Sequence, residues 1–140
     1  MSKKSAKIAA LIEKCQGREL PAHYLGFFEC FNQGLYYEAH DVVEELWLPV
    51  RHESDGKFYQ GLIQLAGAFV HLQKDRLRPA AALFDKAREN LKKYPVVHHS
   101  LNVAKTLTLI EEWSSRLHAA AFAENPLQTQ PPPKLNVESN

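Results

Sequence analysis

Hydrophobic positions along this chain recur with the period of an α-helix, and no stretch shows the apolar-polar alternation of a half-buried strand. Six helical segments can be traced, over residues 8–15, 21–31, 36–48, 57–73, 79–94 and 100–121. The fourth has no charged side chain from Phe58 to Leu72, which is typical of a buried helix. The pattern therefore predicts an all-α domain.

Glycine, proline and serine predict where these helices begin and end. Gly17 and Gly34 follow the first and second segments, as residues that close a helix do. Pro49 is expected to stop the third helix, because a proline disfavours the helical conformation of the residue before it. The fifth helix is expected to begin near Pro79, and Ser100 to cap the sixth.

A weak internal repeat relates the second and third helices to the fourth and fifth. At an offset of 41 residues, Ala39 aligns with Ala80 and Val43 with Phe84. Alternating small and large residues resemble the tetratricopeptide repeat, although that repeat has 34 residues. The polar loop of residues 49–56 accounts for most of the excess. We expect two antiparallel helix pairs in a tetratricopeptide-like stack, flanked by an N-terminal and a C-terminal helix.

A change of composition predicts the domain boundary. The 140 residues are enough for one domain with a real core, and we place it at residues 1–124. After Glu124 the chain becomes rich in Pro, Gln and Asn, with three prolines at positions 131–133. Residues 125–140 are therefore expected to be an extended or disordered tail.

Net charge and cysteine content limit the kinds of partner and the cellular compartment that the sequence indicates. The formal net charge is only +1, which does not indicate a nucleic-acid groove or an anionic membrane surface as a partner. No apolar stretch reaches the length that a transmembrane helix needs. Cys15 and Cys30 lie on apolar faces without metal-ligand spacing, so we expect reduced thiols in a cytoplasmic protein.

The candidate chemistry lies where the third and fourth helices meet. Helical spacing puts His40 and Glu44 on one side of the third helix, beside Trp47 at the end of its apolar face. Gln60 and Gln64 share one narrow arc of the fourth helix. Because the connecting loop is short, these helices should be antiparallel neighbours, which would place Glu44 level with Gln60 and His40 with Gln64. Trp47 is expected to be largely buried against the fourth helix.

Two interpretations of this polar cluster compete. In the first, the glutamine amides hydrogen-bond to His40 and Glu44 and fix the register of the helices. In the second, His40 and Glu44, four residues apart on one helix, hold a divalent metal ion. A third ligand would then have to come from elsewhere, since glutamine is a poor ligand for transition metals. The adjacent His98 and His99 are expected to point in different directions and are interpreted as solvated side chains rather than ligands.

The same segment resembles a family of bacterial and archaeal proteins, domain of unknown function 309. The matching motifs are Glu38-Ala39-His40-Asp41, Glu44-Glu45-Leu46-Trp47 and Gln60-Gly61-Leu62. Asp41 stands where the family has glutamate, and the resemblance covers about residues 28–91. The family is all-helical and is sometimes labelled a predicted metal-dependent hydrolase. The resemblance adds Glu38 as a candidate, although helical spacing puts it on the solvent face, where another element would have to cover it.

Two functional hypotheses follow. One is a small binding or adaptor module that uses a groove between helix pairs to hold a protein partner or a second copy of the chain. The other is a metal-dependent hydrolase, in which His40 with Glu44 or Glu38 holds a divalent ion and its activated water. The chain has no Ser-His-Asp order, nucleotide-binding glycine loop or HExxH motif that would indicate another chemistry.

Overall fold

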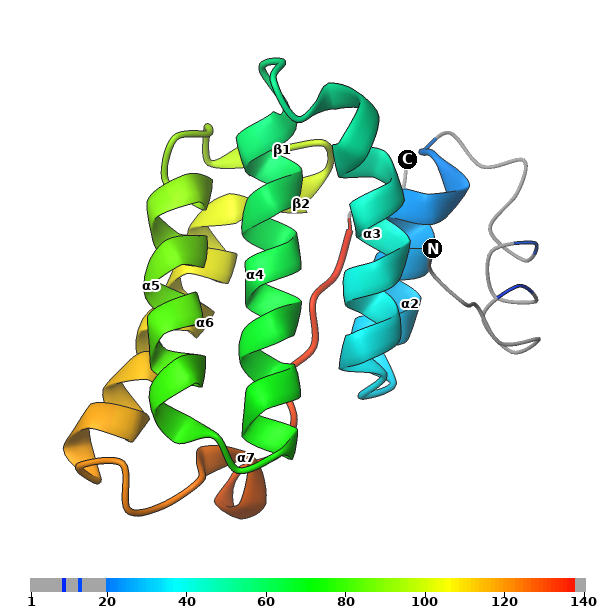
Figure 1. Cartoon of the computed structure of the whole chain (residues 1–140). Coiled ribbons are helices and arrows are strands. Elements are labelled where there is room, and N and C mark those ends of the chain that lie inside the picture. The colour runs from blue at the N-terminus through cyan, green and yellow to red at the C-terminus, as the bar shows by residue number, and fades with distance from the viewer. Residues whose placement is uncertain (1–8, 10–12, 14–19, 138–140) are drawn as a thin grey trace.

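The computed structural model describes residues 20–137 and, ahead of them, Ala9 and Glu13. The described elements are α2 (Ala22–Asn32), α3 (Tyr36–Val50), α4 (Gly56–Gln73), α5 (Leu77–Leu91), β1 (Val97–His98), β2 (Leu101–Asn102), α6 (Val103–Ala119) and α7 (Pro126–Thr129) (Figure 1). The predicted all-α class is confirmed, with one short antiparallel hairpin added between α5 and α6. The predicted first helix and Cys15 fall outside the described residues, apart from Ala9 and Glu13.

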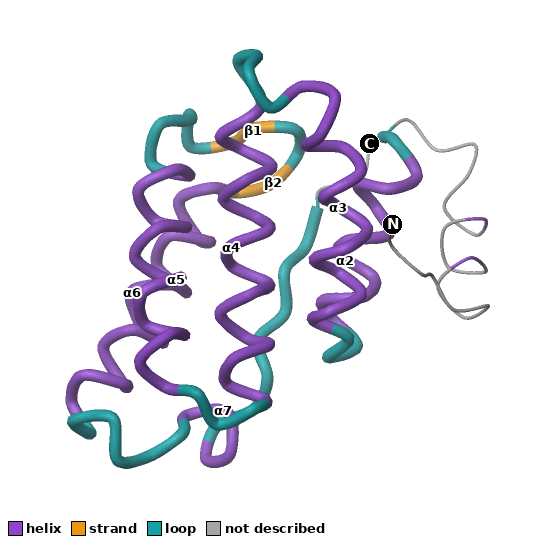
Figure 2. Tube along the Cα trace, in the orientation of Figure 1, coloured by secondary structure: helices purple, strands orange, loops and turns teal. Residues whose placement is uncertain are grey.

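Consecutive helices pack on one another from α2 to α6. Short connections make each neighbouring pair antiparallel, as Figure 2 shows for α3, α4 and α5. The α2–α3 and α4–α5 pairs are therefore present, and the finer likeness to a tetratricopeptide stack stays a prediction. Among the described residues, none of the helices has the length and apolarity needed to cross a membrane.

The core is organised around Phe69 of α4, which is fully buried. Its ring contacts one aromatic ring from each of the other four long helices, with centroids 5.0–5.4 Å apart. These four rings belong to Phe31 of α2, Tyr36 of α3, Phe84 of α5 and Trp113 of α6. Edge-to-face and stacked contacts of this kind add to the free energy of burial, so α4 is the central helix of the bundle.

Two predicted helix ends are corrected. Pro49 does not stop the third helix, because α3 continues through it to Val50. The proline lies in the last turn, where it removes only one intrahelical hydrogen bond. Ser100 does not cap the last long helix: it has φ of +63° in the hairpin turn. Asn102 caps α6, its side-chain oxygen accepting a hydrogen bond from the amide of Lys105 at 2.9 Å.

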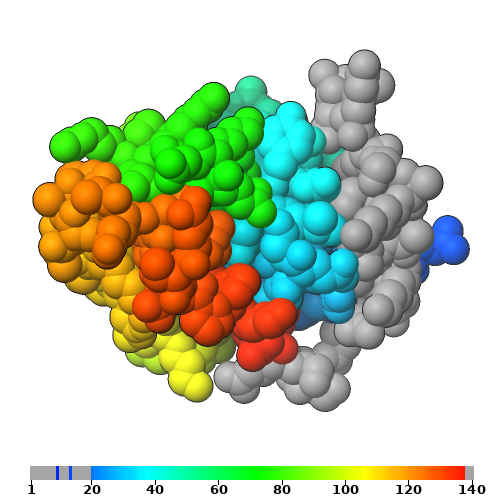
Figure 3. All heavy atoms as spheres, turned by 90° about the horizontal axis from the view of Figure 1, so that it is seen from below, coloured from blue at the N-terminus to red at the C-terminus, as the bar shows by residue number. Residues whose placement is uncertain are grey.

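The chain after α7 is extended and runs back towards α2 (Figures 1 and 3). The Asn32 side chain accepts from the Leu135 amide at 2.8 Å and donates to its carbonyl oxygen at 2.7 Å. Leu135 is buried, and Val137 forms a β-bridge with Leu101. The C-terminal segment thus connects α2 with the hairpin.

Candidate functional site

The two glutamines of the predicted cluster find their partners elsewhere. The side-chain oxygen of Gln64 accepts a hydrogen bond from Asn90 of α5 at 2.7 Å. That of Gln60 accepts from Lys57, one turn earlier on α4, at 3.3 Å. Neither bonds to His40, so the predicted network across α3 and α4 is not formed within the described chain. The reason is that α4 lies between α3 and α5, and Gln64 is bound from the α5 side.

The α3 side chains of the cluster are half-buried. Glu38 is among them, although helical spacing predicted that it would face solvent, and so is Glu44. His40 Nδ1 lies 3.4 Å from the carboxylate of Asp41. Trp47 is also half-buried rather than largely buried, because it lies in the last turns of α3, where the chain leaves the bundle. Its indole Nε1 is shielded from solvent and has no hydrogen-bond partner in the described part of the chain.

His40 and Gln64 do share one feature, a pocket of about 230 Å³ between α3, α4 and α5. Its lining consists of Tyr37, His40, Ile63, Gln64, Gly67, Val70, His71 and Leu83. Tyr37 is 61% exposed, and its ring lies parallel to the His40 ring, with centroids 6.3 Å apart. The structure thus brings two of the predicted residues to one cavity, as neighbours rather than as hydrogen-bond partners.

His71 contributes an uncharged imidazole to this pocket. Its Nδ1 is buried and has no hydrogen-bond partner among the described residues. Burial lowers the pKa of His71 below its ordinary value, and the positive charges of Arg76 and Lys74 lower it further. The wall that His71 forms is therefore neutral near pH 7.

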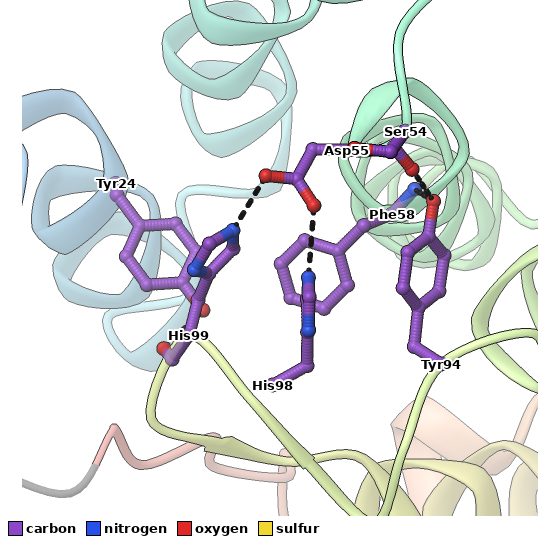
Figure 4. Close-up of polar contacts among 7 residues, drawn as sticks. All are labelled: Tyr24, Ser54, Asp55, Phe58, Tyr94, His98 and His99. Atoms are coloured by element: carbon purple, nitrogen blue, oxygen red, sulfur yellow. Dashed lines mark hydrogen bonds and ion pairs between the residues drawn. The ribbon is translucent and has the colours of Figure 1, made fainter.

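A second polar cluster, which we call the Asp-His-His cluster, consists of Asp55, His98 and His99 (Figure 4). Asp55 is the residue before α4, and the two histidines lie in the hairpin between α5 and α6. One carboxylate oxygen of Asp55 lies 2.9 Å from His98 Nε2, and the other lies 2.8 Å from His99 Nε2. Both imidazoles therefore converge on one carboxylate from the same side, as Figure 4 shows.

Aromatic rings surround the two imidazoles. Phe58 meets the ring of His98 edge-on at 4.8 Å and that of His99 at 5.5 Å. Tyr94 lies 4.8 Å from His98, and Tyr59 stacks on His99 with an interplanar angle of 9°. These contacts restrict the rotation of both rings and hold their Nε2 atoms toward Asp55.

Two tyrosine hydroxyls fix the backbone around the cluster. The hydroxyl of Tyr94 accepts from the amide of Phe58 at 2.8 Å and donates to the carbonyl of Ser54 at 2.7 Å, on either side of Asp55. The hydroxyl of Tyr24 on α2 donates to the carbonyl of His99 at 2.8 Å. The loop that carries Asp55 and the hairpin that carries the histidines are thus each tied to the bundle.

The charge state of the cluster follows from these contacts. Burial by itself raises the pKa of the Asp55 carboxyl, but hydrogen bonds and attraction from His98 and His99 outweigh it, so the pKa lies below its ordinary value. Burial raises the pKa of Tyr24 and Tyr59, and the Asp55 carboxylate adds to this effect. Asp55 is therefore a carboxylate at neutral pH, next to neutral phenols.

Sequence reasoning missed this cluster because it took adjacent histidines to point apart. That holds in a regular strand, where successive side chains alternate. Here His99 has φ of +47°, and the two rings lie side by side with centroids 4.2 Å apart. A usable signal was present: in an antiparallel bundle, the α3–α4 and α5–α6 connections lie at the same end. Asp55 lies in the first and the two histidines in the second.

Comparison with known proteins finds a family model that is similar to residues 24–83. They match the family model "Domain of unknown function (DUF309)", which confirms the resemblance predicted from the motifs. An uncharacterized protein of Aquifex aeolicus (strain VF5) is 27% identical over 82 residues, which are 59% of this chain and 25% of that protein. The chain thus spans about a quarter of that relative's length. No solved structure matches the chain. The family segment includes His40 and Asp55 but ends before His98 and His99.

Proposed function

We propose that this chain, whose residues 24–83 match the DUF309 family model, is a protein-binding module that uses the pocket between α3, α4 and α5. The observation that carries the proposal is the pocket itself, with the exposed Tyr37 and the half-buried His40 at its α3 side. Tyrosine is enriched at the centres of protein interfaces, since it combines a large apolar ring with a polar tip.

The size of the pocket favours one side chain of a partner over a cofactor. Pockets for drug-sized ligands usually measure about 300–1,000 Å³. This one is about 230 Å³, room for one large side chain. Ile63, Val70 and Leu83 line it from α4 and α5, so the side chain that fits best is apolar or aromatic.

A stripe along the outer face of α3 extends the surface beyond the pocket. Tyr37, Glu44 and Leu48 lie on one face of α3, at spacings of seven and four residues. Both ends of this stripe are exposed, with 61% of Tyr37 and 46% of Leu48 accessible to solvent. A partner segment seated in the pocket can therefore continue along α3 over about three turns.

Charge identifies the kind of partner. α3 carries carboxylates at positions 38, 41, 44 and 45, of which Asp41 lies beside His40 and Glu45 beside His23, and it has no lysine or arginine between Tyr36 and Val50. Complementary charge steers association and selects partners. We therefore propose that the partner is a peptide segment with one large apolar residue next to lysine or arginine.

A peptide-display library screened against the full chain tests this proposal. Peptides retained by the wild type should share a large apolar residue next to basic residues. Tyr37→Ala should weaken their binding at least tenfold, because it removes the exposed ring of the pocket. Val96→Ala is the matched control, since Val96 is 65% exposed but lies outside the pocket, and it should bind like the wild type. Failure to enrich any such motif, or equal binding by Tyr37→Ala, would reject the pocket as the binding site.

The alternative hypothesis is a metal-dependent hydrolase that uses His40 with Glu44 or Glu38. No observation supports it as the pocket supports the binding module. Within the described residues, the His, Cys, Asp and Glu ligand atoms that come together in a group of three belong to Asp55, His98 and His99. A metal ion on α3 would need a third ligand beside His40, and that group does not supply one.

A further inference from the structure

We propose that the Asp-His-His cluster is a binding site for a divalent transition-metal ion of the Zn²⁺ class. The observation behind it is the convergence of three ligand atoms, one from each of Asp55, His98 and His99, all within 4.8 Å of one another. This site lies apart from the pocket of the proposed binding module, and neither proposal depends on the other.

The donor set selects the class of metal. Two imidazole nitrogens and one carboxylate oxygen suit zinc, iron, cobalt or nickel, whereas calcium and magnesium prefer ligand sets made of oxygen atoms. Two histidines with one carboxylate also occur in proteins as a three-ligand face that leaves other coordination positions open. Mg²⁺ is therefore the natural negative control for Zn²⁺.

The distances fit an ion after a small movement. Ligand atoms bound at about 2.0–2.1 Å to one tetrahedral zinc ion lie about 3.3 Å apart. Asp55 now lies 2.9 Å from His98 Nε2 and 2.8 Å from His99 Nε2. Binding would lengthen the two Asp55 contacts by about half an ångström and bring closer any ligand atoms of the group that now lie up to 4.8 Å apart.

The residues around the cluster fix the orientation of its side chains, unlike those around a chance contact of surface groups. Metal-binding histidines need their ring orientation fixed by neighbouring groups. Phe58 packs on both imidazole rings, and the hydroxyls of Tyr24 and Tyr94 hold the two backbone segments. His99 and Ser100 keep positive φ angles without being glycine, a conformation that persists only where surrounding contacts impose it.

Solvent access remains open. The side chains are 32% exposed at Asp55, 23% at His98 and 36% at His99. An ion can therefore enter from solution and retain water or another ligand in its remaining positions. To bind it, each Nε2 must give up the proton that it now donates to Asp55, because the metal needs the nitrogen lone pair.

Titration calorimetry with Zn²⁺ and with Mg²⁺, on the full chain free of any affinity tag, tests the site. We expect one Zn²⁺ per chain and no comparable binding of Mg²⁺. The double substitution His98→Gln with His99→Gln should weaken Zn²⁺ binding at least a hundredfold. Each glutamine can still donate a hydrogen bond to Asp55, so the fold should persist, which far-UV circular dichroism would verify.

The matched control removes two other histidines. His52 and His118 are both exposed and lie outside the cluster, so His52→Gln with His118→Gln should bind Zn²⁺ like the wild type. If the double glutamine variant is misfolded, Asp55→Asn is the second test and should weaken binding at least tenfold. Absence of one-to-one Zn²⁺ binding in the wild type, or undiminished binding in folded variants of the cluster, would overturn the proposal.

Discussion

Two tyrosine hydroxyls of this chain differ in hydrogen bonding, and this difference should affect stability. Tyr36 is buried at the centre of the bundle, where burial raises the pKa of its hydroxyl to about 12, and this hydroxyl has no hydrogen-bond partner among the described residues. The hydroxyl of Tyr94, in contrast, forms hydrogen bonds with the backbone of Phe58 and Ser54. The amide of Phe58 lies in the first turn of α4, where no intrahelical partner exists for it.

Phenylalanine substitutions should therefore act differently at the two positions. Tyr36→Phe removes an unsatisfied buried group, so the free energy of unfolding should stay level or rise by up to about 1 kcal/mol. Tyr94→Phe removes both hydrogen bonds and should lower it by about 1–2 kcal/mol. Urea unfolding of the two variants measures the difference. A larger loss from Tyr36→Phe than from Tyr94→Phe would mean that the Tyr36 hydroxyl has an essential partner.

His71 should make the stability of the folded chain depend on pH. Its pKa is lowered in the folded chain, chiefly by burial, so the unfolded chain binds the proton more readily. Its contribution to stability is present above the unfolded pKa of about 6.5 and is lost as the pH falls below that value. Between pH 8 and pH 5, His71→Gln should lose less stability than the wild type. His118→Gln, at an exposed position on α6, should follow the wild type. Parallel pH profiles for His71→Gln and the wild type would show that His71 does not resist protonation.

At the element scale, the C-terminal extended segment makes a specific contact with α2. Leu135 is only 4% exposed, and its backbone is paired with the Asn32 side chain. Leu135→Ala should lower the free energy of unfolding by about 2–4 kcal/mol, because it empties a buried site. Asn136→Ala, at an exposed position next to it, should change stability by less than about 0.5 kcal/mol. Chemical unfolding followed by circular dichroism separates the two, and equal small effects would show that the segment does not pack as described.

Helices were predictable from this sequence, whereas their connections were not. The periodicity of Phe58, Leu62, Leu65 and Phe69 reports directly which face of α4 is buried, because core packing requires it. The hairpin strands have two residues each, too short for any period to show. Their turn has positive φ at His99 and Ser100, without the glycine or asparagine that usually indicates it.

In the candidate site too, some features follow from helical spacing and others do not. His40 and Gln64, which helical spacing predicted to lie level with each other, both line one cavity, and both lie on regular helices. Helical spacing did not indicate that Gln64 would bond to Asn90, because the orientation of an amide depends on the third helix that packs against it. The Asp-His-His cluster depends on backbone conformations in two loops 43 residues apart, which no local pattern encodes.

At the scale of the whole molecule, the Asp-His-His cluster joins distant parts of the chain at one end of the bundle. Asp55 belongs to the α3–α4 connection, His98 and His99 to the α5–α6 connection, and Tyr24 binds the same hairpin from α2. An ion at this point would cross-link segments that separate when the chain unfolds. It would therefore act on global stability and not only on the local loops.

Zn²⁺ should consequently raise the thermal midpoint of the entire domain. An ion that binds only the folded chain, at 100 times its dissociation constant, contributes about 2.7 kcal/mol. For a chain of this size that corresponds to roughly 10 °C. The increase should be seen equally by far-UV circular dichroism and by tryptophan fluorescence, since Trp113 is buried in the core, where it packs on Phe69. It should vanish in the variant with His98→Gln and His99→Gln and persist in the variant with His52→Gln and His118→Gln. The same increase in both variants would mean that Zn²⁺ acts through other surface groups, and the cluster would then be a structural clasp of hydrogen bonds alone.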